Sequence, residues 1–438
     1  MSRFLSNAAG LSGRRLIVAA VVWAVMIIAG GFCLWWGFAS PETTEEPATE
    51  PASTATDVTT SPPLPTNTPP IQPDVAPPGD AGPEAFGYGI AADALLLPEY
   101  TTIQVQNLGL GWIKQQLRWE DFSPGPGEMD WSGYDAVVDE ANQHGLKVML
   151  SVVGAPAWSR SYFDSNPEAA PPDDFADFTA FLGQLVDRYQ GRIHAIEVWN
   201  EQNLDREWDT AEGVSAARYV EMLRLAYQTI KSRDPNIIVI SGALSPVGAS
   251  ATDPNNPARV IYLNDRDYFQ QMINQGFLDY CDCVGAHHNG YNIPPDVRWN
   301  DAYQDDSATF RGFWDNPDIS WSFRSTLEEY HNQIVAAGRD TPLCVTEFGW
   351  ASDDGLGGYP PGFEFARDNS LEEQATYDVQ AFHLMREWGF VRLAFLWNLD
   401  YANKGPRTPD DPNAPYSIVD YDGAPRPAFG AIGAMDKP

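Results

Sequence analysis

The sequence predicts an α/β fold, a (β/α)8 barrel that spans residues 85–438. Eight short apolar, β-branched runs recur in this region, and amphipathic segments with helical spacing lie between most of them. A length of about 350 residues suits such a barrel, whose usual size is about 200 to over 400 residues. Polar or aromatic side chains stand at the C-terminal ends of different runs, where a barrel builds its active site. These residues are Arg118, Glu201, His287, Glu347 and Trp397.

The expected strands are defined by their apolar character and by the turns and helices between them. They cover residues 85–90, 112–119, 147–154, 194–199, 236–242, 281–287, 342–348 and 392–398. An open doubly wound sheet would alternate in a similar way. The sequence lacks a GxGxxG phosphate loop after the first strand, and the strand-end residues favour the barrel.

The helices between the strands are predicted from apolar residues spaced three or four apart. In the segment 132–145 the apolar face ends at Gly145, and in the segment 173–191 it ends at Gly191. The first face consists of Tyr134, Val137, Val138 and Ala141, and the second of Phe175, Phe178, Phe181, Leu182 and Leu185.

The N-terminal region is expected to be a membrane anchor followed by a spacer. Residues 16–38 contain no charged side chain, and a helix of this length would rise about 34 Å. Arginines precede it and glutamates follow it, which places residues 1–15 in the cytoplasm and the remainder outside. A cleaved signal peptide has a shorter apolar core, so an uncleaved single-pass anchor in the cell membrane is favoured.

Residues 39–84 read as a disordered linker that holds the barrel away from the membrane. The stretch 41–83 has 12 prolines, no Lys or Arg and few large apolar side chains. Such a composition cannot bury enough surface to offset the entropy of ordering.

The overall charge excludes a nucleic-acid partner. The chain has 60 acidic and 27 basic residues, a formal net charge of −33. Binding phosphates requires the opposite balance. Nothing in the sequence points to an obligate protein partner.

The four cysteines do not form a disulfide framework. Cys281 or Cys283 could reach Cys344 if their strands are neighbours. Strand parity argues against a bridge, because Cys281 and Cys283 share a face with His287, whereas Cys344 is opposite in parity to Glu347. Buried free thiols are therefore expected.

Two glutamates carry the strongest functional signal. Glu201 in "IEVWNEQNL" and Glu347 in "LCVTEFGW" each follow an apolar strand and have large aromatic neighbours. Partial burial raises the pKa of a carboxyl group, as a general acid requires, and a nearby guanidinium lowers it, for which Arg118 is the candidate. Pairs of carboxyl groups with such different environments cleave glycosidic bonds.

These stretches resemble the fourth-strand and seventh-strand motifs of clan A glycoside hydrolases. Family 39 and its cellulase-like relatives in family 5 are the most similar, and supporting stretches cover nearly all of residues 85–435. They include "LRWEDFSPGPGEMDWSGYDAVVDEANQHGLKVML", "SVVGAPAWS" and "YSIVDYDGAPRPAFGAI". The third strand ends in "GAPAW", without the histidine of family 5, which favours the family 39 label.

The resemblance implies a retaining β-glycosidase that works by double displacement without a cofactor. Glu347 would be the nucleophile and Glu201 the acid/base. Asn200 would bind the sugar 2-hydroxyl, Arg118 would hold Glu347 ionised, and Trp397 would lie beneath the sugar. Related enzymes have His-x-Tyr on the sixth strand, whereas this chain has "HHNGY". Either Tyr291 takes the role of that tyrosine or Asn289 replaces it.

Further aromatic and histidine residues stand at or near the ends of the predicted strands, where they could bind a substrate or a metal ion. Trp158, Trp350 and Tyr291 are candidates for stacking on sugars, and loop packing explains each of them equally well. His287 and His288 would point to opposite faces of a strand, so a metal site is not expected. A barrel that binds glycans or cell-wall polymer without turnover is the alternative function.

Overall fold

The computed structural model describes residues 86–161 and 170–438. The predicted cytoplasmic segment 1–15, the predicted anchor 16–38 and the predicted linker 39–84 lie outside the described residues, as does residue 85. Among the helices of the two described ranges, none combines the length and the apolar character needed to cross a membrane.

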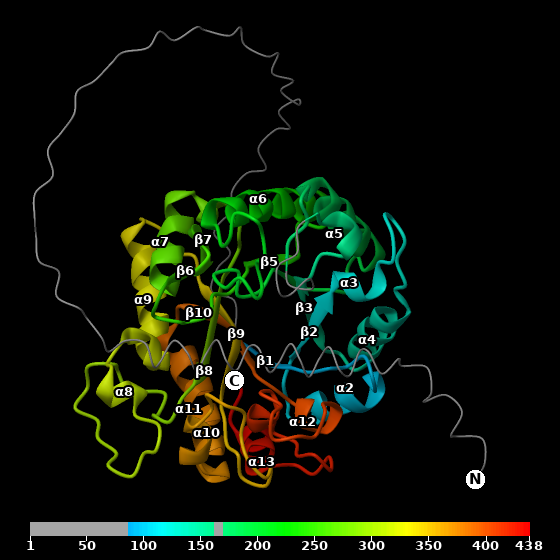
Figure 1. The fold of residues 1–438 in the computed structure, drawn as a ribbon. Coiled ribbons are helices and arrows are strands. Elements are labelled where there is room, and N and C mark those ends of the chain that lie inside the picture. Colours follow the sequence, from blue (N-terminus) through cyan, green and yellow to red (C-terminus); the bar gives the residue numbers. More distant parts are fainter. Residues whose placement is uncertain (1–85, 162–169) are drawn as a thin grey trace, which may run out of the picture. The chain divides into compact units, whose positions relative to one another are not determined.

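Eight parallel strands form the barrel, as predicted (Figure 1). Each predicted run coincides with one of them. In chain order they are β1 Gly87–Ala91, β2 Trp112–Arg118, β3 Lys147–Val153, β4 Ala195–Val198, β5 Ile238–Ser241, β8 Val284–Gly290, β9 Leu343–Trp350 and β10 Val391–Leu396. Their order in the sheet is β5-β4-β3-β2-β1-β10-β9-β8. A bridge between Ile240 and Cys283 brings the two ends together and nearly closes the barrel.

Helices surround the strands (Figure 1). The longer ones are α2 Pro98–Asn107, α4 Ser132–Gln143, α5 Phe175–Arg188, α6 Ala216–Arg233, α7 Asp265–Asn274, α9 Phe323–Ala336, α11 Leu371–Trp388 and α13 Pro427–Ala434. Shorter elements in the connections are α3 Trp119–Phe122, α8 Gly312–Asp315, α10 Phe365–Asp368, α12 Tyr401–Lys404 and the hairpin of β6 Ala251–Asp253 with β7 Asn256–Tyr262. The 3-10 turns are η1 Ala157–Ser159, η2 Phe277–Asp279, η3 Ile319–Trp321 and η4 Ala414–Tyr416.

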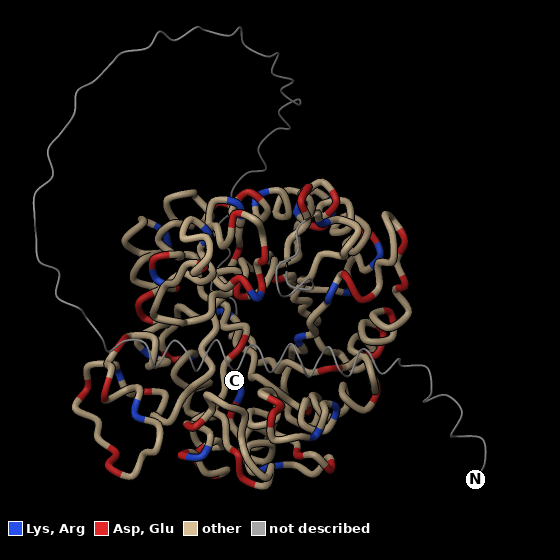
Figure 2. The backbone as a smooth tube through the Cα atoms, in the orientation of Figure 1, with Lys and Arg blue, Asp and Glu red and all other residues tan. Residues whose placement is uncertain are grey.

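Capping residues mark the ends of α5 and α11. Asp174 caps α5 by accepting a hydrogen bond from the amide of Ala176. Ser370 and Glu373 form a reciprocal capping box at the start of α11, which ends at Gly389 in the left-handed region. The predicted inward faces of α4 and α5 are buried. Lysines and arginines lie among the acidic residues on the outer helices and loops (Figure 2).

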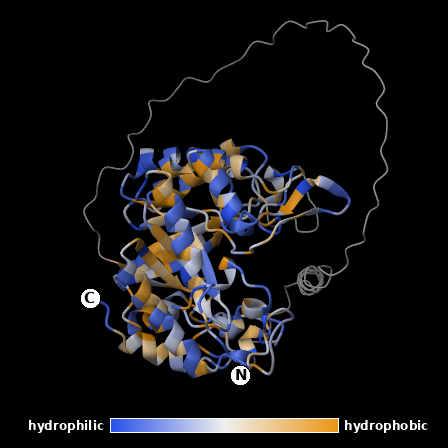
Figure 3. Cartoon of the chain, turned by 90° about the vertical axis from the view of Figure 1, so that its left-hand side faces the viewer, coloured by the Kyte–Doolittle hydropathy of each residue, from blue (hydrophilic) through white to orange (hydrophobic). Residues whose placement is uncertain are grey.

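The barrel interior has two layers that differ in polarity. The lower layer, toward the N-terminal ends of the strands, is apolar. The strands are among the most hydrophobic parts of the fold (Figure 3). The lower layer consists of Trp112, Met149, Ala195, Ile240, Cys283, Cys344, Leu393 and Phe395. Strand β1 has glycine here because a Cβ atom on Gly89 would lie 2.4 Å from the ring of Phe395. The upper layer contains charged side chains and carries the candidate site.

The seam between β5 and β8 depends on close backbone approach. A Cβ atom on Gly285 would lie 2.0 Å from the carbonyl oxygen of Ser241. The Gly285 amide instead donates a hydrogen bond to Ser241 Oγ, at 3.1 Å. Only glycine therefore fits at this position of the seam.

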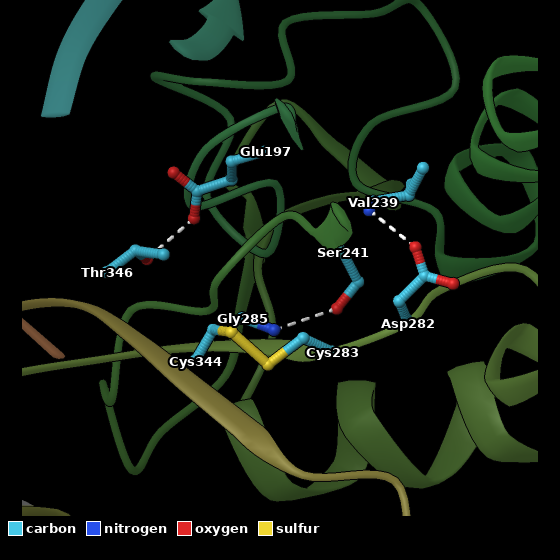
Figure 4. The surroundings of a disulfide bond; sticks show 8 residues. All are labelled: Glu197, Val239, Ser241, Asp282, Cys283, Gly285, Cys344 and Thr346. Carbon is cyan, nitrogen blue, oxygen red and sulfur yellow. Dashed lines mark hydrogen bonds between the residues drawn. A yellow bond between two sulfur atoms is a disulfide. The ribbon is translucent and has the colours of Figure 1, made fainter. Parts of the chain in front are cut away.

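A disulfide joins Cys283 to Cys344, so the expectation of free thiols is wrong for these two cysteines (Figure 4). Cys281 is free and buried, as expected. The parity argument failed because the β8–β9 pairing shifts by one residue: Ala286 pairs with Val345, and His287 with Glu347. Thr346 is the extra residue of this bulge, which lets Cys344 and Glu347 both face the barrel interior.

Candidate active site

Glu347 lies at the end of β9 and points into the upper layer of the barrel. Its Oε1 atom accepts a hydrogen bond from Lys114 Nζ of β2, at 3.0 Å. The side chain of Lys114 is only 1% exposed. Burial acts to lower the pKa of Lys114, but the charges of Glu197 and Glu347 outweigh it and raise the pKa above its usual value. Lys114 is therefore a permanent cation beside Glu347.

Arg118 does not hold Glu347, which corrects the role expected from the sequence. Its guanidinium pairs with Glu120, with Nε 2.9 Å and the terminal nitrogen 2.8 Å from Oε1. Arg118 is four residues beyond Lys114 on β2, so it stands about 13 Å further along the strand. It lies at the rim of the site, where its side chain is partly exposed.

A third carboxylate lies below Glu347, on β4. Glu197 Oε2 is 3.5 Å from Lys114 Nζ. Its other oxygen accepts a hydrogen bond of 2.6 Å from Thr346 Oγ1, drawn in Figure 4. Neither Glu197 nor Lys114 was predicted from the sequence. The available signal was a single charged residue in the otherwise apolar strand β4 and a lysine directly after two apolar residues in β2.

A sharp turn after β4 positions Glu201. The backbone of Trp199 has φ of 78° and that of Glu201 has φ of 42°, values rare for residues other than glycine. Trp199 is buried and donates from its indole nitrogen to the carbonyl of Glu207, at 2.7 Å. The Glu201 amide donates to the carbonyl of Ala243, at 2.8 Å. The turn thus anchors the indole in the core and aims Glu201 at the barrel axis.

His287 of β8 connects the two predicted catalytic glutamates. Its Nδ1 atom lies 3.3 Å from Glu201 Oε1 and 3.7 Å from Glu347 Oε2, so these two oxygens are at most about 7.0 Å apart. Burial lowers the pKa of His287, but the charge of Glu347 and the hydrogen bond to Glu201 outweigh it and raise the pKa above its usual value. The two acids therefore face one another across one imidazole.

Arg206 forms an ion pair with Glu201, and the sequence analysis missed it. Burial would raise the pKa of the Glu201 carboxyl, but the charge of Arg206 and the hydrogen bond with His287 outweigh it and lower the pKa to about 2. The Arg206 side chain is 48% exposed, whereas that of Glu201 is nearly buried. Glu201 is therefore ionised in this state, in contrast to the raised pKa that a general acid requires.

Asn200 and Trp397 lie beside the two glutamates. Asn200 is buried, and its Oδ1 atom has no hydrogen-bond partner among the described residues. The ring of Trp397, directly after β10, has its centroid 5.9 Å from Lys114 Nζ and 4.9 Å from the ring of Tyr401. Asn200 adjoins Glu201 in the chain and Trp397 lies near Lys114, and their contacts with a sugar stay predictions.

Asn289, and not Tyr291, shares the inward face of β8 with His287. Asn289 pairs with Gly349 in the register of β8 and β9, and its Oδ1 atom is buried without a partner among the described residues. The ring of Tyr291 packs on Phe310, Trp321 and Phe365. In the described part of the chain its hydroxyl makes no hydrogen bond to Glu347.

Trp350 lies in the core, which contradicts its expected role in stacking on a sugar. It is 1% exposed, its indole nitrogen donates to the carbonyl of Ile293, and its ring packs on Phe323. The bulge at Thr346 turns Glu347 inward, and Trp350, three residues later, points to the opposite face. Trp158 is half-buried in η1, donates to the carbonyl of Ser123 and contacts the ring of Trp119.

The carboxylates of the site are arranged around cations and an imidazole. Lys114 and Arg206 neutralise them, and His287 lies between them. In the ranges 86–161 and 170–438, no three His, Cys, Asp or Glu side chains are grouped so that they could hold a metal ion.

Comparison with known proteins supports the sequence resemblance. A family model described as cellulase (glycosyl hydrolase family 5) matches residues 101–403, more than half of the chain. Family 5 is one of the two clan A families that the motifs resemble.

The fold is similar to that of several solved glycoside hydrolases. A family 39 glycoside hydrolase from the gut symbiont Bacteroides cellulosilyticus WH2 is 18% identical, with a TM-score of 0.56 over 80% of this chain and 63% of that chain. The family 39 enzyme from Xanthomonas axonopodis pv. citri is 17% identical, with a TM-score of 0.54 over 82% of this chain and 69% of that one. An exo-β-1,4-mannosidase from Opitutaceae bacterium strain TAV5 is 16% identical, with a TM-score of 0.51 over 80% and 58%. The chain thus spans less than two thirds of the first of these proteins, and identities this low show a shared fold alone.

Proposed function

Because the chain belongs to glycosyl hydrolase family 5, the cellulase family, we propose that it cleaves β-glycosidic bonds of oligo- or polysaccharides with retention of configuration. The observation that carries this proposal is the pairing of Glu201 and Glu347 across His287. Their nearest measured oxygens are at most about 7.0 Å apart. Retaining enzymes separate their carboxyl groups by about 5–5.5 Å and inverting ones by about 6.5–9.5 Å, so the limit includes the whole retaining range and only the lower edge of the inverting range.

The proposed reaction has two displacements. Glu347 attacks the anomeric carbon, a bond forms to its carboxylate oxygen, and the bond to the leaving oxygen breaks while Glu201 gives that oxygen a proton. Glu201 then takes a proton from water, which attacks the glycosyl-enzyme and releases Glu347. The ammonium of Lys114, 3.0 Å from Glu347, favours the charged carboxylate that the first step needs.

Glu201 must gain a proton before the first step, and Arg206 is the obstacle. Arg206 is about half exposed, so a leaving group that enters the site can displace it from Glu201. Burial would then be opposed by His287 without the guanidinium, and the pKa of Glu201 would rise from about 2. Displacement of Arg206 by the substrate thus favours protonation of the acid.

The remaining polar and aromatic side chains would bind the sugar. Asn200 and Asn289 present buried amide oxygens that lack partners among the described residues, and sugar hydroxyls are suitable donors for them. Trp397 offers a ring next to Lys114, which suits the apolar face of a pyranose.

We also propose that the barrel works outside the cytoplasm, anchored through residues 16–38. Disulfides persist mainly in oxidising compartments, so the Cys283–Cys344 bridge supports this location.

Trapping with a panel of 2-fluoro β-glycosides tests the reaction. The reagent that matches the substrate should inactivate the purified protein and label Glu347, and Glu347→Ala and Glu201→Gln should hydrolyse aryl β-glycosides poorly. Hydrolysis that survives both substitutions would contradict the mechanism.

The second candidate is a barrel that binds glycans without cleaving them. The ion pair between Arg206 and Glu201 favours it, because an ionised Glu201 cannot protonate a leaving group. Binding of oligosaccharides, measured by calorimetry, without hydrolysis at any pH between 4 and 8 would support this candidate.

A further inference from the structure

Glu197 is a buried carboxylate that the proposed mechanism does not use. Its side chain is 0% exposed, and it lies in the barrel interior beside Lys114. Isolated buried charges are unstable, so such a group persists only with compensating partners. Its partners are Lys114 Nζ at 3.5 Å and Thr346 Oγ1 at 2.6 Å.

Lys114 is held by groups from two other strands. Its ammonium donates to Glu347 Oε1 at 3.0 Å and to the carbonyl oxygen of Thr346 at 3.1 Å, both on β9. Glu197 of β4 approaches from another side. The ammonium donates two hydrogen bonds, and Glu197 adds a charge contact from which Oε2 gains no hydrogen bond among the described residues. Contacts from both strands therefore restrict the position of Lys114, and Glu197 helps to fix it.

Lys114 and His287 orient the carboxylate of Glu347, and Lys114 also places a positive charge beside it. One carboxylate oxygen, Oε1, faces Lys114, and the other, Oε2, faces His287 at 3.7 Å. Each oxygen thus has its own partner, and rotation of the carboxylate would break both contacts. His287 also approaches Glu197, with Nε2 4.0 Å from Oε1, so Glu197 is next to both partners of Glu347.

We propose that Lys114 and Glu197 are a pair of positioning residues for Glu347. Lys114 keeps the carboxylate charged and oriented for attack, and Glu197 fixes Lys114 and balances its charge. The inference rests on the proposed role of Glu347 as the nucleophile. The pair acts through Glu347 and does not touch the sugar.

Variants of Lys114 and Glu197 should behave differently if the two residues only stabilise the fold than if they position Glu347. Removing one partner of a buried ion pair leaves an unpaired charge and destabilises the fold, whereas replacing both with neutral residues of similar size restores stability. If the pair only stabilises the barrel, activity returns together with stability. If Lys114 positions Glu347, activity stays low in the neutral double variant.

The experiment compares Lys114→Met, Glu197→Gln and the double variant with the wild type. Urea unfolding should show both single variants destabilised and the double variant largely recovered. The kcat/KM of Lys114→Met and of the double variant should fall about 10²-fold, the scale of losing one preorganised charge contact. The loss should fall on kcat more than on KM, because the pair orients Glu347 and does not touch the sugar. Lys147→Met, which removes an exposed lysine that lies over the ring of Trp112, is the matched control.

Recovery of the wild-type kcat in the double variant would overturn the proposal. A second measurement needs no turnover, namely the unfolding cycle of Lys114→Met with Glu347→Gln. Additive effects in that cycle would mean that the two residues are not coupled and would also overturn it. If the wild type hydrolyses no glycoside while the cycle shows coupling, the proposed function fails and the positional link between Lys114 and Glu347 stands.

Discussion

Arg206 binds the carboxylate of Glu201, the residue proposed to protonate the leaving group. The two residues are five positions apart in the loop after β4, and the arginine is the more exposed of the two. The charge of Arg206 is the largest influence that opposes burial at Glu201 and lowers the pKa of its carboxyl group.

Replacing Arg206 should change the pH dependence of hydrolysis. In Arg206→Met burial is no longer opposed by the guanidinium, so the pKa of Glu201 should rise from about 2. A general acid acts while it is protonated, so the basic limb of the kcat/KM profile should move to higher pH. Arg192→Met, which breaks an exposed pair with Asp139, is the control and should leave the limb in place. A limb that does not move in Arg206→Met would show that Arg206 does not govern this acid.

The two glutamates should differ in their response to the leaving group. Glu201→Gln should lose about 10²–10⁴-fold in kcat on an alkyl β-glycoside, the usual contribution of a general acid. It should lose far less on a dinitrophenyl glycoside, whose leaving group departs without a proton. Glu347→Gln should be equally inactive on both, since it cannot form the glycosyl-enzyme. Rates with a series of aryl glycosides check this prediction, and equal sensitivity of both variants to the leaving group would refute the assignment.

Loss of the disulfide should destabilise the barrel. Cys283 and Cys344 are 61 residues apart, and bridges that close loops of this size contribute about 2–4 kcal/mol. Cys344→Ala should therefore unfold at lower urea concentration and become insensitive to reductant. Cys281→Ala keeps the bridge and is the control, which should still respond to reductant. A wild type whose unfolding is unaffected by dithiothreitol would argue against the bridge.

The seam between β5 and β8 should not tolerate a side chain at Gly285. Gly285→Ala places a Cβ atom against the Ser241 carbonyl, and we expect a loss of about 1–3 kcal/mol in the free energy of unfolding. Gly430→Ala in α13 meets no atom within 4 Å and should be neutral or stabilising by about 1 kcal/mol. Calorimetric melting of the two variants gives the comparison, and equal melting temperatures would contradict a closely packed seam.

The sequence was enough for the barrel and for the two central acids. The eight apolar runs are each long enough to define a strand, and Glu201 and Glu347 follow two of them directly. The face of a regular strand on which a side chain lies could be predicted, because successive side chains alternate between the two faces. The inward faces of α4 and α5 followed in the same way from helical spacing.

The errors arose where one strand had to be placed against another. The bulge at Thr346 reversed the parity of β9, which hid the disulfide. Trp350 follows Glu347 by three residues, so period two alone places it on the opposite face of β9. Lys114 and Arg118 share one face of β2, and only the stagger of the barrel strands decides which of them meets Glu347. Arg206 reaches Glu201 through a loop whose path no periodic pattern specifies.

The two layers of the barrel interior separate the residues that stabilise the fold from those proposed to react. Eight apolar side chains pack in the lower layer, and the proposed reacting groups lie in the upper layer. Directed evolution toward new sugars can therefore keep the lower layer unchanged and vary only residues of the upper layer. Substitutions meant to raise the melting temperature belong in the lower layer.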